Sequence, residues 1–229
     1  MSLTHRWTLD GNANDSVGSL NGTVVGSPTT QTGHPAPNAT TNCYGFAGNS
    51  ADRIKVTNNA GLTSSNISLN VWCQLTSLSA LSTIIGKFWD GTNRAYDLFF
   101  ENTAQGFAFD VAGASSNTDH IAYTGLSGIS TNTWYMVTGT FDGTTVKVYV
   151  NGTVGSTTAA LSDTVRTNTA DLIFGAQPRN PTPTSSFLSP MNGRISDVRM
   201  YNHALTQAEI TALYAVPVDT KPFLTLMRR

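Results

Sequence analysis

The chain has 229 residues, of which only 12% are charged, and its formal net charge is −1. This composition excludes the cationic surface on which nucleic-acid binding depends, and no apolar stretch reaches the roughly 20 residues of a transmembrane helix. Only four Lys and two Glu stand against 34 Thr, which favours strands over helices. The N-terminal residues lack an apolar core segment, so we expect no conventional secretion signal.

The first notable stretch is DGNANDSVG, residues 10–18, which follows a first predicted strand. Asp10, Asn12 and Asn14 alternate as do the first oxygen ligands of an EF-hand loop. That loop also requires Gly at position 6 and Glu at position 12, where this chain has Asp15 and Asn21. An EF-hand is therefore excluded, and the stretch is predicted to form a polar turn.

The middle of the chain shows the period-two pattern of β-strands. The run ISLNVWCQL, residues 67–75, places Ile67, Leu69, Val71 and Cys73 on one face. Cys43 lies in another strand-like run, and without a secretion signal the two cysteines are predicted to be buried thiols rather than a disulfide. Because CxxC spacing is absent, no zinc site is expected.

The strongest local signal is WYMVTGTFDGTTVKVYVNGTV, residues 134–154. Two apolar runs flank Asp142-Gly143, a dipeptide typical of a tight hairpin turn. In the second run Val146, Val148 and Val150 share one face, and Asn151-Gly152 predicts a second turn.

Residues 177–190 are rich in Pro, Ser and Thr and are predicted to form a surface loop. A late strand, GRISDVRMY, then places Val198 and Met200 on the face opposite Asp197 and Arg199. One short helix follows, because Thr206 and Glu209 have capping-box spacing before an apolar stripe of Ile210, Leu213 and Tyr214. These elements predict a single all-β domain over residues 1–215.

Taken in order, these pieces resemble the laminin-G-like, concanavalin A-like jelly roll, over about residues 5–215. The resemblance implies two antiparallel sheets packed face to face, one concave and one convex. It rests on five stretches: HRWTLDGNANDSVG, YGFAGNSADRIKV, ISLNVWCQL, TNTWYMVTGTFDGTTVKVYVNG and MNGRISDVRMYNHALTQAEITALY.

The resemblance also implies one structural calcium on the convex side, although none is required. Its ligands would be Asp10, the carbonyl of Gly48 and Asp197, a set of oxygens that suits calcium. One carboxylate of the family pattern is missing, because Ala47 stands where the family often has Asp. The alternative is that Asp10 and Asp15 hydrogen-bond the backbone of their own turn.

No catalytic apparatus is predicted. The jelly-roll glucanases use a Glu-x-Asp-x-x-Glu strand, because glycoside cleavage needs two carboxyl groups. Here Glu209 belongs to the helix cap, and Glu101 has only Asp97, four residues before it, outside that spacing. The four histidines are scattered and no Gly-x-Ser-x-Gly elbow is present. A glucanase or lyase is therefore the least favoured function.

A ligand site on the concave sheet would need aromatic rings and planar polar groups. These residues could supply them, with Phe187 as a further rim residue: Trp89, Arg94, Tyr96, Asp97, Asn117, Asp119, His120 and Arg179. The alternative is that Trp72 and Trp134 belong to the core and Trp89 caps a sheet edge, since most loop aromatics only cover the core.

The segment 216–229 lies beyond the family pattern and is partly apolar. We expect it to dock on the domain or on a neighbouring structural subunit through Phe223, Leu224, Leu226, Met227, Arg228 and Arg229. The function expected is a non-catalytic surface module of a phage or virus virion (a decoration, fibre or tail accessory protein) that also binds surface glycans. The alternative is a free-standing extracellular carbohydrate-binding module or lectin.

Overall fold

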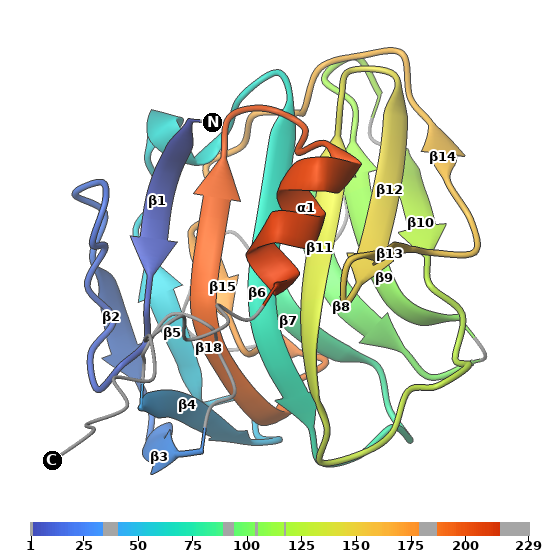
Figure 1. Cartoon of the computed structure of the whole chain (residues 1–229). Coiled ribbons are helices and arrows are strands. Elements are labelled where there is room, and N and C mark those ends of the chain that lie inside the picture. Colours follow the sequence, from blue (N-terminus) through green and yellow to red (C-terminus); the bar gives the residue numbers. More distant parts are fainter. Residues whose placement is uncertain are drawn as a thin grey trace, which may run out of the picture.

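The computed structural model describes residues 2–33, 41–88, 94–103, 105–116, 118–178 and 187–215. Two antiparallel sheets pack face to face, and one helix lies on the outer side of the sheet nearer the viewer in Figure 1. The predicted all-β sandwich with a short helix near its end is confirmed.

We call the first sheet sheet A. Nine strands form it within the described residues. Seven of them follow one another across the sheet in the order β13 (Thr153–Val154), β12 (Thr145–Val150), β11 (Trp134–Phe141), β6 (Ile67–Leu75), β18 (Asn192–Tyr201), β4 (Asn42–Ala47) and β3 (Thr29–Thr32). In addition, β1 (Leu3–Trp7) pairs with β18, and β14 (Ala159–Ala160) pairs with β12.

We call the second sheet sheet B. Its described strands run in the order β10 (Asp119–Tyr123), β9 (Gly106–Ala112), β8 (Arg94–Glu101), β7 (Ser82–Phe88), β15 (Leu172–Phe174), β5 (Arg53–Val56) and β2 (Gly22–Val25). A short 3-10 helix, η1 (Ala60–Leu62), follows β5. The predicted surface loop 177–190 contains a two-stranded hairpin of β16 (Gln177–Pro178) and β17 (Phe187–Leu188).

The core lies between the sheets, and alternation along each strand decides which side chains enter it. In β6, Ile67, Leu69, Val71 and Cys73 are buried in this core, as predicted. Trp72 points to the other side of sheet A, where it joins a second buried cluster. Cys43 and Cys73 are both buried and unbonded, which confirms the prediction of free thiols.

The turn after β11 is built as its sequence predicts. Gly143 has a φ of 92°, a conformation that a residue without a Cβ adopts freely. Asp142 Oδ1 accepts hydrogen bonds from the backbone nitrogens of Thr144 (2.9 Å) and Thr145 (2.8 Å). The second predicted turn is present too, with positive φ at Asn151 and Gly152.

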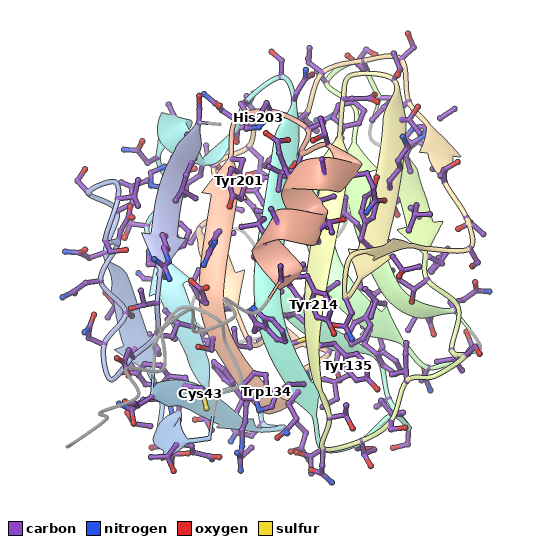
Figure 2. All side chains as sticks on the ribbon, viewed as in Figure 1. Cys43, Trp134, Tyr135, Tyr201, His203 and Tyr214 are labelled. Atoms are coloured by element: carbon purple, nitrogen blue, oxygen red, sulfur yellow. The ribbon has the colours of Figure 1, made fainter. Side chains whose placement is uncertain are left out.

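The helix α1 (Gln207–Tyr214) covers the outer face of sheet A over β6 and β11 (Figure 1). Thr206 and Glu209 form both bonds of the predicted capping box. Ile210 is fully buried, and Tyr214, seen at the end of the helix in Figure 2, stacks on Trp72 with ring centroids 6.0 Å apart. Trp134 is partly buried against this same cluster, so α1 and its side chains cover this part of the outer face of sheet A.

Candidate functional site

Strand register brings polar side chains together at one end of sheet B. Asp97 of β8 lies directly opposite Asp110 of β9, and Ile121 of β10 lies opposite Asp110 in turn. The neighbouring ends of β8 and β10 add an arginine, an aspartate and a histidine. We call this group the β8–β10 cluster: Arg94, Asp97, Asp110, Asp119 and His120.

An ion pair forms the accessible part of the cluster. Arg94 Nη1 contacts Asp119 Oδ2, and the two side chains are 27% and 28% exposed. Both residues begin their strands, so they lie at the rim of the sheet rather than in its middle. The next residue, His120, is partly buried, and its backbone nitrogen donates to Asp110 Oδ1 at 3.0 Å.

The two other carboxyl groups are closed off from solvent, because Asp97 and Asp110 are each only 3% exposed. Gln177 Nε2 donates to Asp97 Oδ2 at 3.4 Å, whereas Asp97 Oδ1 has no hydrogen-bond partner among the described residues. Burial and the adjacent Asp110 raise the pKa of Asp97 well above its usual value, and burial raises the pKa of Asp110 to about 6. Protonation avoids burying two negative charges side by side, and therefore lowers the free energy of the buried pair.

Two members of the predicted ligand set are placed differently from expectation. Tyr96 is fully buried in the core, and its hydroxyl donates to the Leu62 carbonyl at 2.6 Å. It shares the inward face of β8 with Leu98 and Phe100, and this two-residue spacing is the signal that the prediction overlooked. Asp97 does belong to the cluster, but as a buried group rather than an exposed ligand-binding one.

Of the remaining predicted ligand residues, Trp89, Asn117 and Arg179 lie outside the described residues, as does the side chain of Phe187. The same holds for the predicted partner-binding residues of the C-terminal segment. Asp110 is the one cluster member that the sequence analysis missed. Its place opposite Asp97 depends on strand register, which the sequence of one strand cannot give.

Neither glutamate is arranged for catalysis. Glu101 Oε1 accepts from Thr103 N (3.1 Å) and Thr103 Oγ1 (2.9 Å), and the residue opposite it on β9 is Gly106. Glu209 is engaged in the helix cap, as predicted. The described residues therefore place no second carboxyl group directly across from either one.

The three predicted calcium ligands do not converge. Asp197 is fully buried, and its two oxygens accept from Arg6 Nε (2.7 Å) and Arg199 Nη2 (2.6 Å). Burial acts to raise the pKa of Asp197, but the hydrogen bonds and charges of Arg199 and Arg6 lower it by more. The net shift of this pKa is therefore downward. A calcium ion at Asp197 would have to share a carboxylate that is already bonded to two arginines.

The other two predicted ligands are engaged or distant. Asp10 Oδ1 accepts from the backbone nitrogen (2.9 Å) and Nδ2 (2.8 Å) of Asn42. Gly48 N donates to the Met191 carbonyl, so Gly48 lies beside Met191. Met191 is six residues before Asp197, and six residues of extended strand separate Met191 from Asp197 by roughly 20 Å. These residues do not fit one calcium ion, and calcium binding stays a prediction for chelation to test.

The opening turn follows the alternative interpretation at Asp15. Its Oδ1 accepts from the backbone nitrogens of Arg6 (3.0 Å) and Gly18 (2.9 Å), and its Oδ2 lies 2.7 Å from His5 Nδ1. Burial raises the pKa of Asp15, yet the bond to His5 and the backbone bonds lower it more. Asp15 therefore holds the turn together, whereas Asp10 bonds across to Asn42.

Among the described residues, no group of three or more His, Cys, Asp or Glu is arranged to hold a metal ion. Nor does this part of the chain contain a helix with the length and hydropathy that crossing a bilayer requires.

Comparison with known proteins agrees with this fold. A family model described as the concanavalin A-like lectin/glucanases superfamily matches residues 47–211. No curated protein sequence matches the chain significantly.

Solved structures with the same fold are distant in sequence. Domain 4 of an extracellular arabinanase from Geobacillus stearothermophilus, in complex with arabinotriose, is 20% identical with a TM-score of 0.69, covering 93% of this chain and 98% of that one. The binding domain of botulinum neurotoxin serotype D is 19% identical (TM-score 0.66; 93% and 50% covered). That of Paraclostridial Mosquitocidal Protein 1 is 15% identical (TM-score 0.69; 93% and 51%), so the chain spans about half of these two toxin domains.

Proposed function

Because the chain belongs to the concanavalin A-like lectin/glucanase superfamily, we propose that it is a non-catalytic recognition domain that binds glycans at the β8–β10 cluster. Two kinds of structural relative support this proposal. One is a domain solved in complex with arabinotriose, and the others are the binding domains of toxins. At 15–20% identity they support a shared fold, and the choice of site rests on this chain's own residues.

The observation that carries the proposal is the partly exposed Arg94–Asp119 pair at the rim of sheet B. A guanidinium group presents several donors in one plane, and a carboxylate accepts hydrogen bonds from hydroxyl groups. Together they match the alternating donors and acceptors of a sugar. Trp89, which precedes β8 in the sequence, and Asn117, which precedes β10, are proposed members of the same site.

We propose a non-catalytic function because the paired carboxyl groups of Asp97 and Asp110 are buried. Directly opposed residues of adjacent strands have Cβ atoms about 5 Å apart, close to the carboxyl separation of retaining glycosidases. A general acid must nevertheless lie within hydrogen-bond reach of the glycosidic oxygen. Asp97 and Asp110 are almost inaccessible, so substrate does not reach them in this arrangement.

The test is calorimetric titration of a neutral oligosaccharide panel that includes arabinotriose. Asp119→Asn and Arg94→Gln are expected to weaken binding at least tenfold, since each breaks the exposed pair. Asp142→Asn, in the distant hairpin of sheet A, is the matched control and should leave affinity unchanged. Equal affinity in all three variants would refute the site, and release of reducing ends that Asp97→Asn or Glu101→Gln abolishes would refute the non-catalytic assignment.

A second candidate is a structural surface subunit of a phage or virus particle. What favours it is the sequence FLTLM, residues 223–227, which contains four apolar side chains in five positions. Apolar clusters that lie on a protein surface mark interaction sites. This role would place the domain on a particle surface, with the C-terminal segment against neighbouring subunits and the β8–β10 cluster free for glycans.

A further inference from the structure

A second candidate site lies at the same end of sheet B, outside the β8–β10 cluster. It is a pocket of about 380 Å³ between the segment after β5 and the segment before β15, within the size range of small-molecule sites. We call it the Asn58 pocket. Its lining consists of small, amide or hydroxyl residues: Asn58, Asn59, Ala60, Thr63, Thr167, Asn168 and Thr169.

A buried lysine holds the pocket wall in place. Lys87 of β7 is fully buried. Its Nζ donates to Asn58 Oδ1 (2.7 Å), Asn168 Oδ1 (3.0 Å) and the Ala170 carbonyl (2.6 Å). Three protons thus meet three close acceptors, so the ammonium group has no donor left for a ligand.

The same contacts fix the orientation of the asparagine side chains. A carboxamide with its oxygen on Lys87 must turn its NH₂ group away from it. The NH₂ group of Asn168 donates to the Lys87 carbonyl at 3.2 Å. That of Asn58 has no hydrogen-bond partner among the described residues, so a donor in fixed orientation remains available at the pocket.

Some of the pocket's other side-chain groups are also unpaired within the described part of the chain. Asn59 Oδ1 accepts a hydrogen bond from Gly61 N (2.9 Å). The NH₂ group of Asn59 makes no hydrogen bond to the described residues. The hydroxyls of Thr63, Thr167 and Thr169 make no bond to described residues. Each hydroxyl can both donate and accept.

This chemistry selects a neutral ligand rich in hydroxyl groups. An anion would need a cation with free donors, and Lys87 has none to offer. A cation would need carboxylates, and no carboxylate lines the pocket. A ring with several hydroxyls instead meets amide donors and threonine hydroxyls on more than one side.

Resting on the proposed glycan binding, we propose that the Asn58 pocket holds one sugar unit of a neutral oligosaccharide, with Lys87 as a positioning residue. Register places the pocket level with the cluster, because Lys87 pairs with Tyr96, Tyr96 with Val111 and Val111 with His120. The pocket segment that precedes β15 leads into the strand next to β7, so β15 lies two strands from β8 and four strands from β10. With strands about 4.8 Å apart, these separations are roughly 10 and 19 Å. A glycan of several units is long enough to reach both sites, and a monosaccharide fills only one.

The experiment measures affinity for arabinotriose, cellotriose and maltotriose, with trigalacturonate as the anionic comparison. Thr167→Val and Thr169→Val remove hydroxyls at exposed positions without changing side-chain size. Combined, they are expected to weaken the best neutral trisaccharide about tenfold, and its monosaccharide less. Thr30→Val, an exposed threonine on sheet A, is the matched control and should have no effect.

The outcomes separate this inference from the function on which it rests. If Asp119→Asn weakens binding and the Thr167→Val, Thr169→Val double variant does not, the pocket is refuted while glycan binding at the cluster stands. Tighter binding of trigalacturonate than of every neutral trisaccharide would also overturn the neutral ligand. If no saccharide in the panel binds, the proposed function fails and the pocket's role fails with it.

Discussion

Asp110→Asn is expected to make the protein more stable at pH 8. Asp110 is buried beside Asp97, and burial raises its pKa from 3.8 to about 6. A raised pKa means that the native state binds the proton more tightly than the unfolded state. The stability from this proton is therefore present below about pH 4 and is lost as the pH rises through about 6.

The size of the effect follows from the same shift. A rise of the Asp110 pKa from 3.8 to about 6 corresponds to about 3 kcal/mol, as an upper figure, once the group is fully ionised. Asparagine keeps the acceptor for the His120 backbone nitrogen and carries no charge. We therefore expect the variant to gain about 1–3 kcal/mol at pH 8 and almost nothing at pH 4.

The assay is urea unfolding of both proteins between pH 4 and pH 8, followed by tryptophan fluorescence. Asp142→Asn is the control with the opposite sign. Burial acts to raise the pKa of Asp142, but hydrogen bonds from Thr144 and Thr145 lower it overall, so its loss should destabilise the protein at pH 8. The reasoning is refuted if Asp110→Asn is less stable than the parent at pH 8, or if the difference does not change with pH.

Three further outcomes are expected. Thr206→Ala should lower the free energy of unfolding by about 1 kcal/mol, because it removes the capping-box acceptor of α1; an unchanged urea midpoint would contradict this. Asp197→Ala should cost about 3–5 kcal/mol, since it leaves Arg6 and Arg199 without their carboxylate. A chelator should leave the Tm of the parent protein unchanged, and a Tm that falls on chelation would instead support the predicted calcium. Deleting residues 221–229 should keep the Tm of the domain but weaken self-association in sedimentation experiments, and a truncated protein that unfolds would show that the segment belongs to the core.

Much of the fold could be predicted because its signals are local. The Asp142-Gly143 turn and the Thr206–Glu209 cap each depend on residues within a few positions of one another, and both are present as predicted. Alternation in β6 likewise assigned its inward face. In these segments backbone conformation and side-chain period agree with the tertiary structure.

The candidate site was harder to predict because it depends on pairing between strands. The sequence around Asp110 and Lys87 gives no sign of a functional role. Strand register places Asp110 opposite Asp97. Lys87 bonds to Asn58 and Asn168, which are 29 and 81 residues away in the chain. Tyr96 was misplaced although its two-residue spacing from Leu98 pointed inward. The contacts of the predicted calcium ligands also depend on tertiary structure: at Asp197, where β18 is irregular and φ is 48°, the carboxylate bonds to Arg6 and Arg199.

The function proposed for this domain is to bind neutral glycans without cleaving them. The most direct test is an NMR titration of the labelled protein with arabinotriose and other neutral trisaccharides, followed by recovery of the ligand. We expect saturable amide shifts concentrated at Arg94, Asp119 and His120, with the trisaccharide recovered intact. Shifts that never saturate for any member of the panel, or a trisaccharide recovered as shorter products, would contradict it.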